Sequence, residues 1–433
     1  MFSKKFLQSL LIQSSGFIFN IATIAFIAQS LSLTEFGSFS LVVSIITVLV
    51  IFVTSGTSDF SVKEVSNANY YNNSVKLAEI GFYSFAISII LSTFIGLVLI
   101  LVSYMNEILN FELAVFIIVS IFSLSLISLI SSMLRGLGYA VLGQTLNIFI
   151  FPFLFLLLIV ASIFLNFPFT TEDGRDVILT RTLASFFALF LTIPFFIYFW
   201  PIKLKRILSS QFKTEWMDTS YQFLKIGLYG TISRQAGIFL LAIFASMIKV
   251  GEYRIVLLAI IVFEQISIVG IILLQAKFAE GEIYERSKKF KTQIFQIYGS
   301  IFLISFIGLI VFIFIGKQLI SLAFGEAYLG TYFPIIIALI GHMVNLLFGP
   351  VGIFLTMRGY AKLVSFNLGI SLFINLLLSS LLITQYDIVG ATLGFIIGIF
   401  TFNVLSLFSC LKELKFNTSL ISAIQASPFL RPK

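Results

Sequence analysis

The chain has 433 residues, of which 59% are hydrophobic and 11% are charged. One soluble core cannot bury that much apolar surface, so the composition excludes an ordinary soluble protein and indicates a protein whose solvent is lipid. A single cysteine, Cys410, and a single histidine, His342, exclude disulfide frameworks and any metal site built on several Cys or His ligands.

Apolar runs between polar breaks predict an all-α integral membrane protein with about twelve spanning helices, since each crossing needs about 20 apolar residues. The first run is longer than the apolar part of a signal peptide and contains Gln13 and Asn20, so we expect it to remain as the first span. The predicted spans are 6–29, 38–60, 77–104, 113–134, 141–165, 177–200, 223–248, 253–275, 292–315, 333–356, 362–384 and 388–411.

The longest polar connection, 203–222, falls almost midway along the chain and predicts a linker between two six-helix lobes, 1–202 and 223–411. A tail, 412–433, follows the second lobe. Trp216 favours a linker that lies on the membrane surface, and a solvated loop is the alternative. The basic residues are concentrated in the loops of one side, which predicts that both termini, the linker and the tail are cytoplasmic. This topological role explains the excess of positive charge without nucleic acid as a partner.

Segments of the two lobes resemble each other, as expected of a transporter built from repeats. Because six spans per lobe is an even number, both lobes keep one orientation, and we expect a pseudo-twofold axis along the membrane normal with a central cavity between the lobes. The three matched pairs are Met133-Leu134-Arg135-Gly136-Leu137-Gly138-Tyr139-Ala140 with Met357-Arg358-Gly359-Tyr360-Ala361, Phe36-Gly37-Ser38-Phe39 with Val250-Gly251-Glu252-Tyr253, and Asp176-Val177-Ile178 with Asp387-Ile388-Val389.

Small residues and prolines mark special points within the spans. Gly390, Gly394 and Gly398 recur every four residues and predict a close helix contact. Pro152, Pro194 and Pro350 are expected to bend their helices, and Gly349-Pro350-Val351-Gly352 is the predicted flexible point.

The sequence resembles the polysaccharide or O-antigen flippases (Wzx-like) of the multidrug/oligosaccharidyl-lipid/polysaccharide exporter (MOP) superfamily, over nearly its whole length. The resemblance rests on Glu35-Phe36-Gly37-Ser38-Phe39, on Asp59-Phe60-Ser61-Val62-Lys63-Glu64 after Gly56, and on Met357-Arg358-Gly359-Tyr360-Ala361. It implies a cavity that opens alternately to the two sides of a bacterial inner membrane. It also implies undecaprenyl-diphosphate-linked oligosaccharide as the cargo, moved from the cytoplasmic to the periplasmic leaflet.

Charges inside spans are costly, at about 2.5 to 3.5 kcal/mol at mid-bilayer, and so are candidate functional groups. Arg234 and Glu264 lie at similar depth on adjacent predicted helices and are expected to form an ion pair, a cavity site, or both. In a cavity, Arg234 would bind an anionic headgroup, and Glu264 would couple transport to an ion.

Three further residues are weaker candidates for substrate binding. A lone histidine such as His342 is more often a packing residue than a binding group. Arg181 lies one turn from the outer end of its span, where reaching to the interface explains it more simply than binding does. Asn20 is one of several amides within spans, most of which we expect to bond to neighbouring helices.

Charges at the inner ends of spans form a candidate cytoplasmic entrance. Asp59, Lys63, Arg135 and Arg358 stand where a cytoplasmic headgroup would first meet the protein. Exposed charges at a solvated interface are the simpler explanation of the same residues.

The sequence has no Gly-x-x-x-x-Gly-Lys-Ser/Thr loop and no large soluble region, so we expect a transporter that is not an enzyme, with no cofactor and no metal. A cation-coupled multidrug antiporter of the same superfamily is the main alternative to a flippase, and a membrane polysaccharide polymerase is a weaker one. The expected partners are the lipid-linked oligosaccharide, membrane lipid, a proton or sodium ion as the coupling ion, and polysaccharide polymerase and chain-length proteins.

Overall fold

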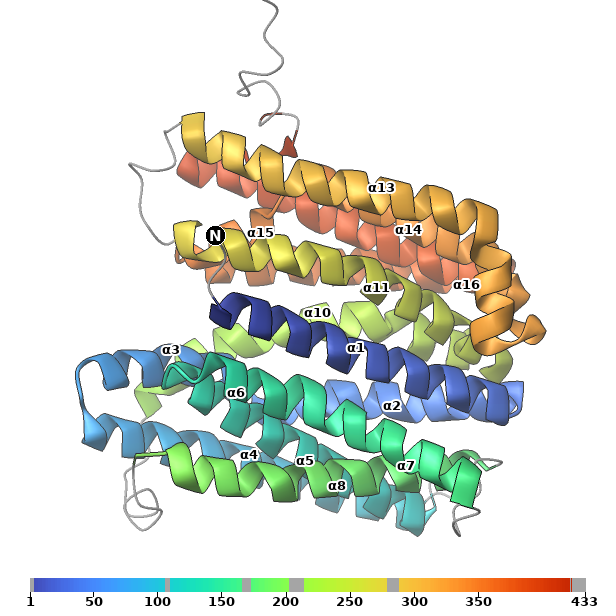
Figure 1. Cartoon of the computed structure of the whole chain (residues 1–433), viewed down its shortest axis with the longest axis horizontal. Coiled ribbons are helices and arrows are strands. Elements are labelled where there is room, and N and C mark those ends of the chain that lie inside the picture. The colour runs from blue at the N-terminus through green and yellow to red at the C-terminus, as the bar shows by residue number, and fades with distance from the viewer. Residues whose placement is uncertain are drawn as a thin grey trace, which may run out of the picture. The chain divides into compact units, whose positions relative to one another are not determined.

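The computed structural model describes residues 4–105, 110–165, 173–201, 214–278, 288–420 and 422, and every regular element in these ranges is a helix (Figure 1). The chain divides into two compact units, Met1–Thr231 and Ile232–Lys433. The boundary falls inside a helix, α10, rather than in the predicted linker, of which 203–213 lies outside the described residues.

The first unit contains the helices of the six predicted N-terminal spans. The predicted span 38–60 is corrected by the structure: it is two helices, α2 and α3, which are separated at Ser55 and Gly56 because both residues adopt positive φ. The fifth span contains one turn of π-helix, η1, and a short 3-10 helix, η2, precedes α10. The elements are α1 (Lys4–Ser30), α2 (Leu33–Thr54), α3 (Thr57–Tyr70), α4 (Ser74–Met105), α5 (Phe111–Gly136), α6 (Ala140–Gln144), η1 (Thr145–Ile150), α7 (Phe151–Leu165), α8 (Gly174–Phe199) and η2 (Thr214–Trp216).

The second unit begins within α10 and contains the helices of the remaining spans. The tenth span is interrupted at Gly349 and Pro350, the predicted flexible point, where Gly349 has φ 68°. The elements are α10 (Met217–Phe244), α11 (Met247–Phe278), α13 (Lys288–Phe324), η3 (Glu326–Thr331), α14 (Tyr332–Leu347), α15 (Val351–Met357) and α16 (Ala361–Leu414).

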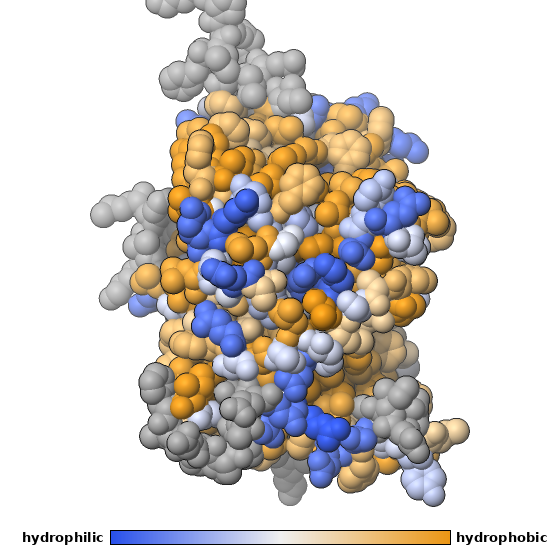
Figure 2. All heavy atoms as spheres, turned by 90° about the vertical axis from the view of Figure 1, so that its right-hand side faces the viewer, coloured by the Kyte–Doolittle hydropathy of each residue, from blue (hydrophilic) through white to orange (hydrophobic). Residues whose placement is uncertain are grey.

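The prediction of an all-α membrane protein is confirmed. Within the described residues, ten helices have the length and hydropathy to cross a membrane. The element α16 is one of these ten, but its 54 residues contain two predicted spans, which are separated at Asp387 where the backbone leaves the helical region. The eighth predicted span, 253–275, lies within α11, which is not among the ten. Every predicted span therefore corresponds to helix in the structure. Large apolar side chains are exposed along α4, α8 and α13, as expected of helices that face lipid. Figure 2 looks onto ends of helices, where hydrophilic residues gather among hydrophobic ones.

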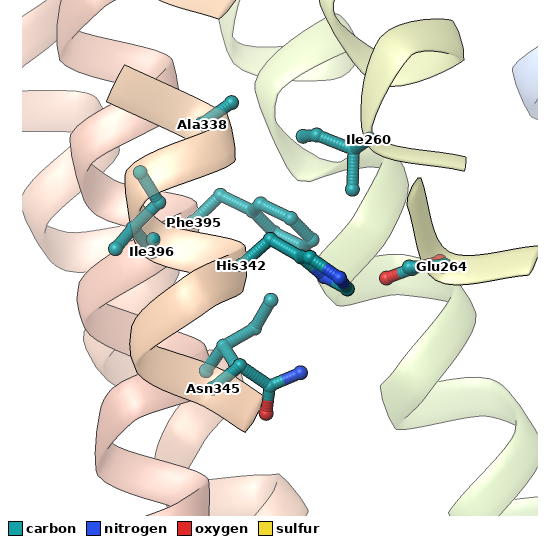
Figure 3. A pocket seen from close by; sticks show the side chains of 9 residues that line it. Ile260, Glu264, Ala338, His342, Asn345, Phe395 and Ile396 are labelled. Atoms are coloured by element: carbon teal, nitrogen blue, oxygen red, sulfur yellow. The ribbon is translucent and has the colours of Figure 1, made fainter. Parts of the chain in front are cut away.

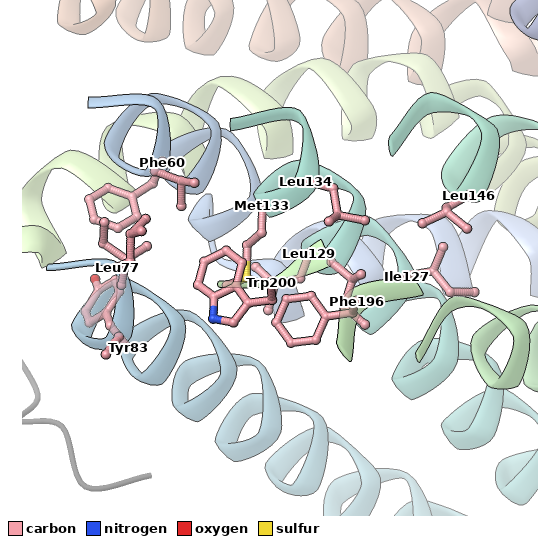
Figure 4. Close-up of a cluster of buried hydrophobic side chains, with 14 of the residues drawn as sticks. Phe60, Leu77, Tyr83, Ile127, Leu129, Met133, Leu134, Leu146, Phe196 and Trp200 are labelled. Atoms are coloured by element: carbon pink, nitrogen blue, oxygen red, sulfur yellow. The ribbon is translucent and has the colours of Figure 1, made fainter. Parts of the chain in front are cut away.

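Serine is the residue that lets α5 occupy the centre of the first unit. This helix packs against α2, α3, α4, α6 and α8, so several of its faces need short side chains. Hydroxyl pairs join it to its neighbours: Ser120 bonds Thr182 of α8 at 3.0 Å, and Ser128 bonds Ser58 of α3 at 3.2 Å. Near its C-terminal end, α5 contributes to a cluster of buried apolar and aromatic side chains that includes Phe60 (Figure 4).

The glycine stripe closes α16 into a helical hairpin, as predicted. A Cβ added to Gly394 would lie 2.7 Å from the backbone nitrogen of Ser379, and one added to Gly398 would lie 2.9 Å from the Cβ of Asn375. The two halves are also joined by a hydrogen bond of 2.7 Å from Ser371 to the carbonyl of Gly398. Close approach of the two halves therefore requires glycine at these positions.

Two of the three predicted repeats have matching local structure. Ser32 and Ser246 occupy equivalent positions at the starts of α2 and α11, where each hydroxyl accepts from the backbone N–H three residues later. The loops that end in Gly138 and Gly359 have the same backbone hydrogen bonds and φ values of 92° and 86°.

The alignment of these loops needs a correction. Gly138 corresponds to Gly359, so Leu137, not Arg135, corresponds to Arg358. The third pair does not match, because Asp176 lies in the first turn of α8 whereas Asp387 forms the break in α16.

Proline shapes the fifth span. Pro152 has no N–H, so it cannot donate to the carbonyl of Ile148 as an α-helix requires, and the π-turn η1 ends two residues before it. Gly16 of α1 lies against that carbonyl, where any Cβ would overlap the oxygen. The α1 helix therefore contacts the fifth span where its helical geometry is irregular.

Candidate functional site

The candidate site is a small pocket in the second unit, between α11, α14 and α16. Figure 3 shows His342 on α14 pointing towards Glu264 on α11. Ile260, Phe395 and Ile396 supply apolar walls, and Asn345 lies beside His342. The pocket is small and partly open, with room for about one water-sized molecule.

Arg234 and Glu264 form the predicted ion pair: Nη1 of Arg234 donates to Oε2 of Glu264. The side chain of Arg234 is 40% exposed and that of Glu264 is 23% exposed, so the pair is not sealed in a solid core. A guanidinium has five N–H donors. One of them bonds Glu264, so the exposed part of Arg234 still presents donors to a ligand.

Two contacts fix the helix that carries Arg234. The amide of Asn375 on α16 donates to the carbonyl and the hydroxyl oxygens of Ser233, at 2.8 and 3.0 Å. One turn beyond Arg234, Gly237 lies so close to the ring of Tyr253 on α11 that a Cβ would not fit. The position of Arg234 is therefore set by α16 on one side and by α11 on the other.

The His342 side chain is 6% exposed, and its Nε2 has no hydrogen-bond partner among the described residues. The ring packs edge-on against Phe263 at 6.2 Å between centroids. Beside it, the side-chain oxygen of Asn345 accepts a hydrogen bond of 2.6 Å from Asn403 on α16. His342 thus packs against a neighbour and also presents a polar edge to the pocket.

The structure brings Arg234, Glu264 and His342 together, whereas the other two binding candidates lie in the first unit. Arg181 is 7% exposed, and its guanidinium lies over the ring of Phe151 at 5.3 Å. The side chain is buried against an aromatic face, so the interpretation that it reaches to the interface is wrong. Asn20 is exposed on α1.

Three of the entrance candidates are near each other in the first unit. Asp59 is exposed on α3 and interacts electrostatically with Arg135 at the end of α5, which also donates to Ser132 at 2.8 Å. Lys63, also on α3, is 63% exposed. Arg358 belongs to the second unit, where its guanidinium lies 5.9 Å from the ring centre of Phe354.

Sequence reasoning missed several residues that shape these regions. Ser233 gave no signal, because a serine in a span resembles any other small residue. Trp216 was expected on the membrane surface or in a solvated loop, but it packs against Phe60 and Tyr83. A polar stretch follows Ser55-Gly56, and this change in composition could have indicated that α3 is a separate helix. Among the described residues, no cluster of three His, Cys, Asp or Glu could hold a metal ion.

The fold is that of MOP-superfamily transporters. The chain is similar to a multidrug resistance MATE family transporter in an inward-facing conformation, with a TM-score of 0.68, 14% identity, and coverage of 98% of this chain and 100% of that one. It is also similar to the lipid II flippase MurJ in an inward closed conformation, with a TM-score of 0.60, 12% identity, and coverage of 93% and 87%.

A third similar structure is a MOP-superfamily transporter from Pyrococcus furiosus, described as having a binding pocket of reversed polarity. Its TM-score is 0.56 at 16% identity, with coverage of 94% of this chain and 95% of that one. No family model and no curated protein sequence matches the chain. The protein is a multi-pass membrane protein with a transporter fold, and these three similar structures are transporters or flippases.

Proposed function

We propose that the protein is a flippase that moves an undecaprenyl-diphosphate-linked oligosaccharide from the cytoplasmic to the periplasmic leaflet of a bacterial inner membrane. The observation that carries the proposal is the partly exposed Arg234–Glu264 pair beside the His342 pocket. The similarity to MurJ and the resemblance of the Glu35–Phe39 and Met357–Ala361 segments to O-antigen flippases support the same assignment.

In the proposed mechanism, the diphosphate competes with Glu264 for Arg234. An arginine fork matches phosphate oxygens well, and charge-assisted bonds of this kind are strong. While the diphosphate is bound, Glu264 is free to take up a proton or a sodium ion. The lobes then expose the site to the other side, and re-pairing of Glu264 with Arg234 releases the headgroup. The lipid tail stays in the bilayer throughout. Each charge moved through 100 mV exchanges about 2.3 kcal/mol with the membrane potential.

The test uses a neutral pair of similar shape. Arg234→Gln with Glu264→Gln removes both charges together and so avoids an unpaired buried charge. We expect this double variant to insert normally, but its cargo binding and transport should fall at least about tenfold, because a charge-assisted phosphate contact is lost. Binding is measured with the lipid-linked oligosaccharide in nanodiscs, and transport by the cargo that accumulates on the cytoplasmic leaflet of cells. Lys317→Gln, which removes an exposed cation of α13, is the control. Normal transport by the double variant would refute the anion-binding role.

A cation-coupled multidrug antiporter is the second candidate, because Glu264 offers a carboxylate to a cationic drug and the similar structures include MATE transporters. Glu264→Gln alone separates the two candidates. It leaves Arg234 without its counter-charge, so an anionic headgroup should bind more tightly to this variant, whereas a cationic drug should bind less tightly. A loss of drug resistance with unchanged binding of the lipid-linked cargo would favour the antiporter. Polymerase and chain-length proteins remain proposed partners of the flippase.

A further inference from the structure

Two helices in the structure are broken at a left-handed glycine. In the first unit, Gly56 has φ 73° between α2 and α3, and in the second unit, Gly349 has φ 68° between α14 and α15. The six-helix repeat does not relate these breaks, because it pairs α2 with α11 and α14 with α5. Any similarity between their surroundings is therefore not a consequence of the repeat.

Trp216, which precedes α10, and the first turn of α10 cover the first break. The ring of Trp216 lies 5.4 Å from that of Phe60 and 5.5 Å from that of Tyr83. Four residues later, the carbonyl of Ser220 lies against Gly56 where a Cβ would overlap it, and Tyr83 donates to the Ser220 hydroxyl at 3.2 Å. Ser220 is 3% exposed, so this contact is buried.

The segment after α16 covers the second break in the same manner. The ring of Phe416 lies 5.1 Å from that of Phe354 on α15. Two residues later, the carbonyl of Thr418 lies against Gly349, and the Thr418 hydroxyl donates to the carbonyl of Phe348 at 3.1 Å. Thr418 is fully buried.

From these contacts we infer that the segments are two latches that fix the angle of each broken helix. The first latch is Trp216 with Ser220, and the second latch is Phe416 with Thr418. Each latch has the same two parts: an aromatic ring packs on the phenylalanine of the short helix, and a buried carbonyl packs on the glycine of the break. A helix interrupted at glycine loses its regular run of i to i−4 hydrogen bonds. Only isolated bonds remain at these breaks, such as that from the Thr57 hydroxyl to the Thr54 carbonyl and that from the Val351 N–H to the Gly349 carbonyl, so the packed segment adds the contacts that set the direction of the short helix.

The latches also position charges. The α3 helix carries Asp59 and Lys63, and α15 ends one residue before Arg358. The packing of the two latches therefore sets the positions of three of the proposed entrance residues. Trp216 and Phe416 are therefore positioning residues for substrate entry. This consequence rests on the proposed function, whereas the latches themselves do not.

Hydrogen exchange of the full-length protein in nanodiscs tests the latches without any substrate. Trp216→Ala should accelerate exchange of the amides of α3 about tenfold or more and leave α15 unchanged, because ring packing on α3 is lost. Phe416→Ala should do the reverse, so each variant is the control for the other. Trp216→Phe keeps an aromatic ring and should restore most of the protection of α3.

Unchanged exchange in α3 and α15, or an equal increase throughout the protein, would overturn the latches. Transport is measured on the same variants. If the latches position the entrance, Trp216→Ala raises the cargo concentration needed for half-maximal transport, and Trp216→Phe reverses the effect. Altered exchange with unchanged transport would overturn the positioning role, whether or not the Arg234 site binds the cargo.

Discussion

Amide side chains determine how the helix that carries Arg234 is held. Asn375 makes two hydrogen bonds to Ser233 and accepts a third, at 3.0 Å, from Ser379. Asn367 likewise bonds Ser406 and Ser409 within the α16 hairpin, as predicted for amides inside spans. The helix that carries Arg234 is thus held by hydrogen bonds to Asn375 as well as by apolar packing.

Replacing Asn375 with Leu should lower stability by about 1–2 kcal/mol, because two interhelical bonds are lost and a buried hydroxyl is left without its donor. Thermal unfolding in detergent measures the change. Asn20→Leu is the matched control, since Asn20 is exposed on α1 and its replacement should leave the midpoint nearly unchanged. Equal midpoints for the two variants would contradict the support role of Asn375.

The pairing of Arg234 with Glu264 was predictable, because counting residues along two adjacent spans places both charges at similar depth. The support by Ser233 was not, because hydrogen bonds between distant serine and asparagine residues depend on helix rotation, which hydropathy does not define. For the same reason, the burial of Arg181 over Phe151 could not be read from its position one turn inside a span.

Breaks within helices are the main feature that hydropathy failed to locate. The predicted break at Gly349-Pro350 was found because proline and glycine coincide there. The break at Ser55-Gly56 and the π-turn at Thr145–Ile150 were missed, because each lies within a predicted span, 38–60 and 141–165 respectively. Most of the remaining helices extend a few residues beyond the predicted apolar runs, because helices continue into the interface, whereas α10 ends at Phe244, before the predicted end of its span at 248.

Close packing inside the α16 hairpin gives a prediction at the level of the element. Gly394→Ala places a methyl group against the backbone of Ser379 and should destabilise the second unit by about 1–3 kcal/mol through overpacking. Gly230→Ala is the same change in α10, where nothing lies within 4 Å, and it should stabilise the protein by about 0.5–1 kcal/mol through helix propensity. Unfolding midpoints that shift in the same direction for both variants would refute this view of the glycine stripe.

At the scale of the whole molecule, the sequence predicts orientation from the concentration of basic residues in alternate loops. Labelling of single cysteines tests it in a Cys410→Ala background, since Cys410 is buried and donates to the carbonyl of Phe416. An impermeant thiol reagent added outside intact cells should label Glu112→Cys and Lys317→Cys but not Lys63→Cys or Lys412→Cys. Labelling of the last two from outside would reverse the predicted topology.

The contact between Gly16 and Ile148 has a consequence for biogenesis. A carbonyl that lacks its usual helical donor is poorly tolerated by hydrocarbon, and here the surface of α1 shelters it. The ribosome makes α1 more than a hundred residues before Pro152, so the sheltering surface is already in the bilayer when the irregular helix arrives. We expect the fifth span to insert more readily beside a helix that was synthesised first, so the order of synthesis is expected to matter for the assembly of this unit.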